Sequence, residues 1–422
     1  MRRHLLPFVT LAVASCRKQS ATTPAPARGG PANDVAIIER ARAIHNRVLT
    51  IDTHKDIPDN FATSEADPKT MNAQVNLDKM KAGGYDMAFF AVYVAQGART
   101  DTGNATAKRR ALNKFAAIHR MAEQMYPNLI EIAYTPADVE RIHKAGKLVA
   151  GIGIENGWAI GRDLSLLKTY YDLGARYMTL SHALNNDICD SSTDPKGPEW
   201  HGLSPFGREV VQEMNRLGMM VDISHVSKQC MLQTTALSTS PVIASHSGVT
   251  AVNNVPRNMD DEELAALATN GGVIQIVGLA EFVKLQPARD SAVRALDEEF
   301  FPTPAEGSGT RRRNRASLTA DRRAEYDRRM EEIEAKWPLA NVVDFVNHID
   351  HAVRTIGIDH VGISSDFDGG GGITGWNDAS QTFNVTLELV ERGYREEDIR
   401  KLWGGNLLRV WTENQRRAKR MP

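Results

Sequence analysis

Histidine and carboxylate side chains occur in this sequence at points where apolar, strand-like runs end. The first run, residues 49–52, is followed by His54 and Asp56. Because strand side chains alternate with a period of two, these two side chains would project to the same side. An imidazole beside a carboxylate supplies half of a metal site. Taken alone, the run is equally compatible with a strand that ends in a polar turn.

Five further residues of the same types follow later apolar runs: Glu155, His182, His225, His246 and Asp366. Each could have a structural role, as a buried imidazole with satisfied hydrogen bonds or as a capping carboxylate. The number of such residues favours a metal-binding or catalytic site over separate structural roles. A rim lined by so many ionisable groups is costly to desolvate unless cations neutralise it or its protonation states shift.

Two divalent metal ions would satisfy this set. We expect His54 and Asp56 to bind one ion. His225 and His246 would bind the other, with Glu155 bridging the two ions through its two oxygens. Imidazole and carboxylate ligands without thiolate favour zinc, and the spacing does not exclude manganese, cobalt or iron. Two ions about 3.5 to 4 Å apart would deprotonate a shared water at neutral pH.

His182 and Asp366 are not assigned as metal ligands in this arrangement. Hydrolysis needs a base that orients the water and passes its proton to the leaving group, and a donor for the developing oxyanion. Asp366 suits the first role and His182 the second.

These side chains can meet only if parallel strands carry them to one edge. From Val35 onward, apolar runs typical of buried parallel strands alternate with longer amphipathic segments. Eight such units favour a closed (β/α)8 TIM-type barrel, in which the C-terminal ends of all strands face one opening. A doubly wound open sheet is the alternative. The predicted strands are Val48–Asp52, Met87–Val94, Leu148–Ile154, Arg176–Leu180, Met219–Ile223, Pro241–Ala244, Gly272–Val277 and His360–Ser364.

Helices are predicted between and after these strands. One segment, Glu281–Leu339, breaks the alternation with an Arg-rich stretch at 311–315 and mixed charges at helical spacing. Such a pattern is typical of a solvated helix; an insertion that covers the barrel mouth or contacts another subunit is the alternative. The clearest predicted helices are Ala107–Met125, Leu164–Leu173, Pro205–Leu217, Asp260–Ala268, Asn384–Arg392 and Glu396–Val410.

The composition is that of a globular protein with a large core. Of the 422 residues, 42% are apolar and 24% charged, and 51 Lys and Arg against 52 Asp and Glu leave a net charge of -1. This balance gives no indication of a nucleic-acid partner. Cys189 and Cys230 are expected to be free and structural, because one pair does not establish a disulfide.

The N-terminus has the features of a targeting segment. Two arginines precede the apolar run Leu5–Ala14, and residues 13–16 resemble a bacterial lipobox ending at Cys16. The run is shorter than the roughly 20 residues that a membrane span needs. We therefore expect a lipoprotein-type signal peptide at 1–16, a flexible tether at 17–34 and the barrel at 35–422. The protein would be exported and lipid-anchored on the periplasmic side of the cell envelope, with simple secretion or a fortuitous match as alternatives.

Six short motifs together carry a family likeness. They are His54-x-Asp56, Glu155 in Gly-Ile-Glu-Asn-Gly, His182 in Leu-Ser-His, His225 in Asp-Ile-Ser-His, His246 in Ala-Ser-His-Ser and Asp366 in Ser-Asp-Phe-Asp-Gly. The combination resembles the membrane (renal) dipeptidases, zinc peptidases of the amidohydrolase superfamily, from about Val48 to Val410. The resemblance implies a (β/α)8 barrel and two zinc ions bridged by Glu155. It also assigns His182 to the carbonyl oxygen and Asp366 to proton transfer.

The resemblance also implies substrate contacts. Arg257 matches the family arginine that holds the substrate's C-terminal carboxylate, a role that suits its forked guanidinium. Tyr93 looks like the aromatic residue that assists it, although a strand tyrosine can also be a core residue. Lys55 departs from the more usual Asn and should face away from the metals. Glu281–Leu339 has no clear counterpart, which leaves substrate preference open.

The expected function is therefore a metal-dependent dipeptidase in which a metal-bridging hydroxide attacks dipeptides that carry a free C-terminal carboxylate. Hydrolysis of another amide or lactone at the same centre, such as a β-lactam or an N-acyl amino acid, is the alternative within the enzyme class. A lipid-anchored protein that binds peptides or metal without turnover is the alternative outside it. The likeness is compatible with a homodimer, although no interface is visible in the sequence.

Overall fold

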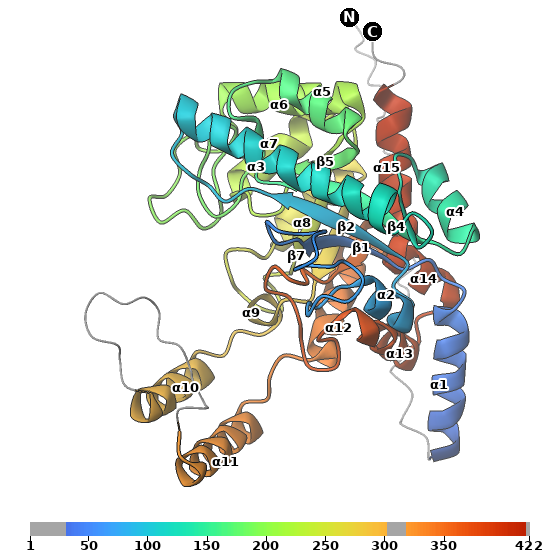
Figure 1. Cartoon of the computed structure of the whole chain (residues 1–422), viewed down its shortest axis with the longest axis vertical. Coiled ribbons are helices and arrows are strands. Elements are labelled where there is room, and N and C mark those ends of the chain that lie inside the picture. Colours follow the sequence, from blue (N-terminus) through green and yellow to red (C-terminus); the bar gives the residue numbers. More distant parts are fainter. Residues whose placement is uncertain (1–30, 302–317, 419–422) are drawn as a thin grey trace, which may run out of the picture.

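The computed structural model describes residues 31–301 and 318–418, and within them nine parallel strands form one sheet (Figure 1). Eight of these strands follow one another around a ring. The last strand returns to the first, where the Asp56 amide donates to the Phe367 carbonyl oxygen (2.9 Å). The sheet therefore closes, which confirms the predicted barrel over an open sheet. The ring consists of β1 (Ile51–Asp56), β2 (Met87–Tyr93), β4 (Leu148–Glu155), β5 (Ala175–Thr179), β6 (Met220–Asp222), β7 (Ile243–Ser247), β8 (Val273–Val277) and β9 (Val361–Ser364).

Besides shifts of one to three residues in the limits of other strands, two features of the sheet differ from the prediction. β1 lies at 51–56 rather than 48–52, because its later residues pair with β2 and with Phe367. His54 and Asp56 are thus strand residues themselves. A short extra strand, β3 (Ile130–Ile132), pairs with the first residues of β4, while the later residues of β4 pair with β5.

Helices surround the ring, and local sequence explains where several begin. α6 begins at the predicted Pro205, after the Ser204 side chain accepts the Gly207 amide. α8 begins with a capping box formed by Asp260 and Glu263. The helices are α1 (Pro31–His45), α2 (Leu77–Gly83), α3 (Asp101–His119), α4 (Pro136–Lys144), α5 (Ser165–Asp172), α6 (Pro205–Leu217), α7 (Lys228–Leu237), α8 (Asp261–Asn270), α9 (Ala280–Val283), α10 (Pro287–Phe300), α11 (Ala320–Lys336), α12 (Val342–Ile356), α13 (Phe383–Glu391), α14 (Glu396–Arg400) and α15 (Asn406–Ala418).

Two predicted helices are altered by local geometry. α3 begins at Asp101, because the Thr100 side chain caps it, and its predicted last turn is a π-helical turn at 120–125. The predicted helix from Glu396 is divided into α14 and α15 by a second π-helical turn at 401–405.

The barrel is filled by side chains rather than by solvent. An inner cluster combines strand residues such as Phe89 and Tyr177 with Trp411 of α15, whose ring lies 5.8 Å from that of Phe89. α15 therefore closes the end of the barrel opposite the site described below. A larger cluster lies between the strands and the outer helices. Cys189 and Cys230 are both buried and free.

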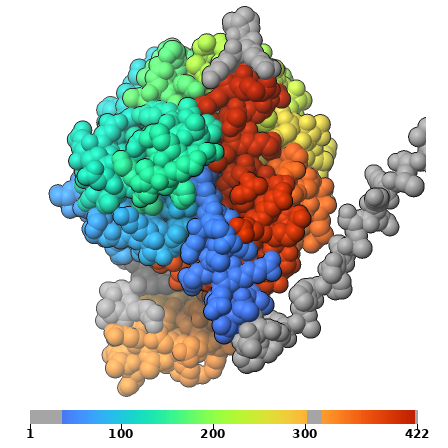
Figure 2. Space-filling view, turned by 90° about the vertical axis from the view of Figure 1, so that its right-hand side faces the viewer, coloured from blue at the N-terminus to red at the C-terminus, as the bar shows by residue number. Residues whose placement is uncertain are grey.

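The segment Glu281–Leu339 is mostly a helical hairpin, called here the arm, formed by α10 and α11. The arm extends from the barrel and appears as an orange lobe below the body in Figure 2. It has a small core of its own, in which the Tyr326 hydroxyl donates to the Asp297 carboxylate (2.9 Å). The predicted Arg-rich stretch at 311–315 lies outside the described residues.

The N-terminal predictions fall largely outside the described residues as well. The signal peptide, Cys16 and most of the tether therefore stay predictions. α1 begins at Pro31, within the last four residues predicted as tether. Among the described residues, no helix combines the length and apolar character needed to cross a bilayer.

Candidate metal centre

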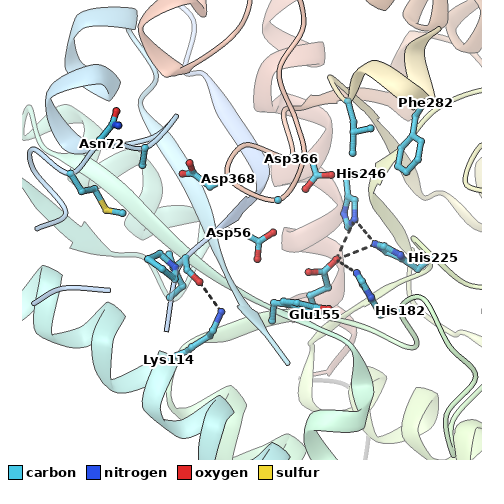
Figure 3. A pocket seen from close by; sticks show the side chains of 17 residues that line it. Asp56, Asn72, Lys114, Glu155, His182, His225, His246, Phe282, Asp366 and Asp368 are labelled. Carbon is cyan, nitrogen blue, oxygen red and sulfur yellow. Dashed lines mark hydrogen bonds and ion pairs between the residues drawn. The ribbon is translucent and has the colours of Figure 1, made fainter. Parts of the chain in front are cut away.

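A cavity of about 590 Å³ opens at the C-terminal ends of the strands (Figure 3). His54 is fully buried behind the cavity wall, where it lies next to Glu155. The sequence-predicted residues of the centre thus come from six strand ends to one place. The predicted residues that line the cavity are Asp56, Tyr93, Glu155, His182, His225, His246 and Asp366.

Glu155 occupies the middle of the cluster. Its Oε1 atom lies 3.0 Å from His225 Nε2, 3.4 Å from His182 Nε2 and 3.5 Å from His246 Nε2. Its Oε2 atom faces the other way, 3.4 Å from His54 Nε2. The carboxylate is buried, yet its imidazole neighbours, with His54 and His182 foremost, outweigh burial and hold its pKa well below the ordinary value. Glu155 therefore presents one oxygen to each half of the cluster.

His54 supplies the clearest sign that a cation fits here. Its Nε2 atom is buried and has no hydrogen-bond partner. The same atom lies 3.7 Å from Asp56 Oδ2 and 4.0 Å from Asp366 Oδ1. A buried polar atom without a partner is costly, and an imidazole nitrogen that faces three carboxylates is a ready metal ligand. The cluster contains three sets of three residues that could each hold a metal ion, because the ligand atoms within a set lie within 4.8 Å of one another. The sets are His54 with Glu155 and His246, Glu155 with His182 and His225, and His54 with Asp56 and Asp366.

Hydrogen bonds at Nδ1 fix how the rings of His54 and His246, two of the predicted ligands, are oriented. Tyr177 Oη donates its hydrogen to the Thr53 carbonyl (2.8 Å), so toward His54 Nδ1, 3.1 Å away, it can only accept a hydrogen bond. Ser245 Oγ donates to Asp222 (2.6 Å) and accepts from His246 Nδ1 (2.8 Å). In both rings Nδ1 carries a proton, so Nε2, which faces the cluster, is the nitrogen that would ligate a cation.

Gly153 provides the space that Tyr177 needs to reach His54. A Cβ atom at Gly153 of β4 would lie 2.0 Å from the Tyr177 ring, so only glycine lets Tyr177 pass β4 and reach His54. Gly153 thus has a packing role that also positions the predicted ligand His54.

Tyr177→Phe should therefore weaken metal binding about 10-fold, the usual scale for loss of a hydrogen bond behind a ligating histidine. Metal affinity measured by competition with a chromophoric chelator tests this independently of turnover. Tyr170→Phe is the matched control, since Tyr170 is also buried and donates to a backbone carbonyl (Ala159, 2.9 Å) away from the site. Equal affinities for the two variants would contradict a positioning role for Tyr177.

Backbone conformation contributes to the site as well. Asn156, His225 and Asp366 have positive φ values of 75°, 69° and 58°. This left-handed region is uncommon for residues other than glycine. Three such residues next to or within one cluster indicate that the surrounding loops hold them there, a pattern seen at functional sites.

The electrostatics of the chain favour neutral imidazoles at His225 and His246, and more weakly at His182. Burial lowers the pKa values of His225 and His246 well below the ordinary value, and the nearby Arg257 cation lowers both further. The neutral form is the one that ligates metals. At Asp366, burial and the Asp56 and Glu155 carboxylates raise the pKa to about 8 against the opposing effect of His54. A bound cation would reverse that shift.

A sequence profile described as membrane dipeptidase, peptidase family M19, matches residues 38–422. The chain belongs to the membrane dipeptidase family. A curated relative, dipeptidase tcpJ from Claviceps purpurea (strain 20.1), is 31% identical over 350 residues, which cover 82% of this chain and 70% of the relative. Family membership identifies the chain as a metal-dependent peptidase and confirms the predicted family and enzyme class.

Two solved structures agree with this fold. The probable dipeptidase PvdM from Pseudomonas aeruginosa has a TM-score of 0.77 at 33% identity, covering 91% of this chain and 99% of that one. A metallo peptidase from Rhodobacter sphaeroides, crystallised with a phosphinate mimic of the dipeptide L-Ala-D-Ala, has a TM-score of 0.66 at 22% identity, covering 87% and 99%. The second likeness concerns the fold alone.

Distances in this membrane dipeptidase do not separate the predicted ligands from the predicted acid–base residues. His182 lies as close to Glu155 as His54 does, and Asp366 lies almost as close to His54 as Asp56 does. The individual roles therefore stay predictions. Tyr93 lines the cavity, with its ring 4.7 Å from that of His182, so it is a residue of the site rather than of the core alone.

Arg257 lies behind the cavity wall. Its Nη2 atom donates to the His246 carbonyl (3.1 Å) and its guanidinium is 5.1 Å from the Phe282 ring centre. Its Nε atom is buried without a hydrogen-bond partner. The predicted contact with a substrate carboxylate is not tested by this arrangement. Lys55 does not line the cavity; its ammonium pairs with Asp368 at 2.9 Å.

Sequence reasoning missed several residues of this dipeptidase site. Tyr177 and Asp222 lie behind the predicted ligands. Tyr177 belongs to no motif, and Asp222 opens the Asp-Ile-Ser-His motif that was used only for His225. Phe282, at the start of the segment Glu281–Leu339, lines the cavity, so that segment contributes to the mouth through its first turn. Lys114 also lines the cavity. A signal for Lys114 existed, because it interrupts the apolar face of α3 formed by Ala107, Ala111, Phe115 and Ile118.

Proposed function

We propose that this chain hydrolyses dipeptides at a centre of two divalent metal ions, with zinc the ion that its donor set suits best. His54 and Asp56 would hold one ion. His225 and His246 would hold the other, and Glu155 would bridge both. The observation that carries this proposal is the geometry of Glu155, whose two oxygens face different imidazoles.

The remaining side chains of the cluster suit the proton transfers of amide hydrolysis. Bound divalent ions would acidify a water molecule and polarise the scissile carbonyl. Asp366, at the edge of the His54 half, would take the proton of the attacking water and return it to the departing amine. His182, across Glu155 on the other half, would donate a hydrogen bond to the oxyanion as the carbonyl carbon becomes tetrahedral.

The cavity and Arg257 support a small substrate with a free carboxylate. About 590 Å³ is a small-molecule pocket, and its deep wall is formed by the cluster itself, so short peptides fit it better than protein chains. Arg257, whose buried Nε has no hydrogen-bond partner, would hold the C-terminal carboxylate. Relatives named dipeptidases support the same substrate class.

Metal removal tests the catalytic part of the proposal. Dialysis against a chelator should abolish hydrolysis of alanyl-alanine, and two equivalents of zinc per chain should restore it, as followed by amine release and elemental analysis. The same peptide with an amidated C-terminus should be cleaved poorly, because Arg257 would have no carboxylate to bind. Metal retention without cleavage of any dipeptide would favour the binding-protein alternative. Cleavage confined to β-lactams or N-acyl amino acids would favour the other hydrolase.

A further inference from the structure

Lys114 is a buried cation in the wall of the cavity that the proposed chemistry does not use. It projects from α3, and only 5% of the residue is exposed. Its ammonium donates to the Ile57 carbonyl oxygen (2.7 Å) and lies 5.9 Å from the Tyr93 ring centre. Burial lowers the pKa of Lys114, while the carboxylates of Asp56 and Asp59 oppose that effect. Burying an ammonium group here is costly, so its presence calls for a counter-charge or a function.

No carboxylate in the described part of the chain lies within hydrogen-bond distance of the Lys114 ammonium. Among the described residues, Ile57 is the one hydrogen-bond acceptor of the ammonium, and the nearest carboxylate, Asp59, is 4.0 Å away and 68% exposed. Lys55 makes the contrast clear, because its equally buried ammonium is paired with Asp368 at 2.9 Å. An ammonium group has three donors, and the Ile57 carbonyl uses one. Lys114 thus retains donors for a ligand in the cavity.

The position of Lys114 indicates which part of a ligand it would meet. In Figure 3, Lys114 and Phe282 lie at opposite ends of the pocket, with Asp56, Glu155 and the imidazoles between them. Arg257 stacks on Phe282 at the far end. A dipeptide held there by its C-terminal carboxylate, with its scissile carbonyl at Glu155, would extend its N-terminal residue toward Tyr93 and Lys114.

We propose that Lys114 binds the side-chain carboxylate of an acidic N-terminal residue, so that the enzyme prefers dipeptides that begin with glutamate or aspartate. This inference rests on the proposed dipeptidase function. A buried ammonium–carboxylate contact is charge-assisted, and its presence or absence should change specificity by about 10-fold or more. The side-chain amide of glutamine or asparagine has the same shape as the carboxylate but lacks its charge. A comparison of substrates that begin with glutamate and with glutamine therefore measures the contribution of the charge alone.

The experiment compares kcat/KM for glutamyl-alanine and glutaminyl-alanine. The wild-type enzyme should prefer the glutamyl substrate by about 10-fold or more, mainly through KM. Lys114→Gln, which keeps a donor for Ile57, should bring the ratio close to one. Arg110→Gln is the matched control, because Arg110 lies one turn earlier on α3 and contacts Asp59 (3.2 Å) but is outside the cavity wall. This control should keep the wild-type ratio.

Several results would overturn the assignment. They are a wild-type enzyme without preference for glutamyl-alanine, a Lys114→Gln ratio equal to that of wild type, and a Lys114 effect seen with alanyl-glutamate in place of glutamyl-alanine. The first of these needs no variant, so it stands even if Lys114→Gln does not fold. Failure of the proposed function itself looks different, because the wild-type enzyme would then cleave neither peptide.

Discussion

Glu155→Gln should reduce dipeptide hydrolysis by about 10⁴-fold or more, the scale expected when a group shared by a whole catalytic unit is removed. Each Glu155 oxygen faces a different half of the cluster, at 3.0 Å from His225 and 3.4 Å from His54. A glutamine has one weakly basic carbonyl oxygen and one NH2 group, which cannot ligate a cation. One half of the cluster would therefore lose its anionic ligand, and the other would lose negative charge.

The metal content of Glu155→Gln shows whether its loss of hydrolysis comes from the loss of a bridging ligand. Elemental analysis should find two ions per wild-type chain and fewer than two in Glu155→Gln, while the melting temperature confirms folding. Glu131→Gln provides the matched control, because Glu131 pairs with Arg141 (2.6 Å) on the outside of the barrel. That control should retain both ions and normal turnover. A Glu155→Gln enzyme with two ions and undiminished kcat would show that Glu155 is not a bridge.

The parts of the fold that could be predicted are those that local pattern determines. Buried parallel strands are continuous apolar runs, and chemistry at their C-terminal ends stands out against those runs, as at Glu155 and His246. Strand limits were less predictable. β1 was placed three residues too early, because its true limits depend on pairing with β2 and on the Asp56–Phe367 contact that closes the barrel. Such contacts join residues far apart in the sequence, 311 positions for Asp56 and Phe367, and leave no local pattern.

Support behind the ligands was missed for the same reason. Tyr177 looks like a core strand residue, and nothing in the sequence shows that Gly153 opens a path from it to His54. The arm was predicted as a charged helix, but its pairing into a hairpin depends on contacts around Tyr326. Phe282 was overlooked because it stands in the segment taken as an insertion, although its ring lies in the cavity wall.

Asp366→Asn should lower kcat by about 10³-fold or more while leaving the metal content unchanged, because removal of an essential general base costs on this order or above. The substitution keeps the shape of the side chain and removes its ability to take up and return a proton. It should also preserve the backbone. Asp366 has a φ of 58°, and asparagine is among the few residues that adopt this conformation readily. The Gly371 amide that donates to the Asp366 carbonyl (2.7 Å) is unaffected.

Asp56→Asn is the comparison variant, because it separates the loss of a metal ligand from the loss of a proton carrier. Both carboxylates lie within 4.0 Å of His54 Nε2, and distance alone does not distinguish their roles. If Asp56 is a ligand and Asp366 the proton carrier, Asp56→Asn should lose metal and Asp366→Asn should keep it. Loss of metal from Asp366→Asn would make Asp366 a ligand. A metal-replete Asp366→Asn enzyme with near-normal kcat would exclude it as the base, because no proton could then pass through its amide.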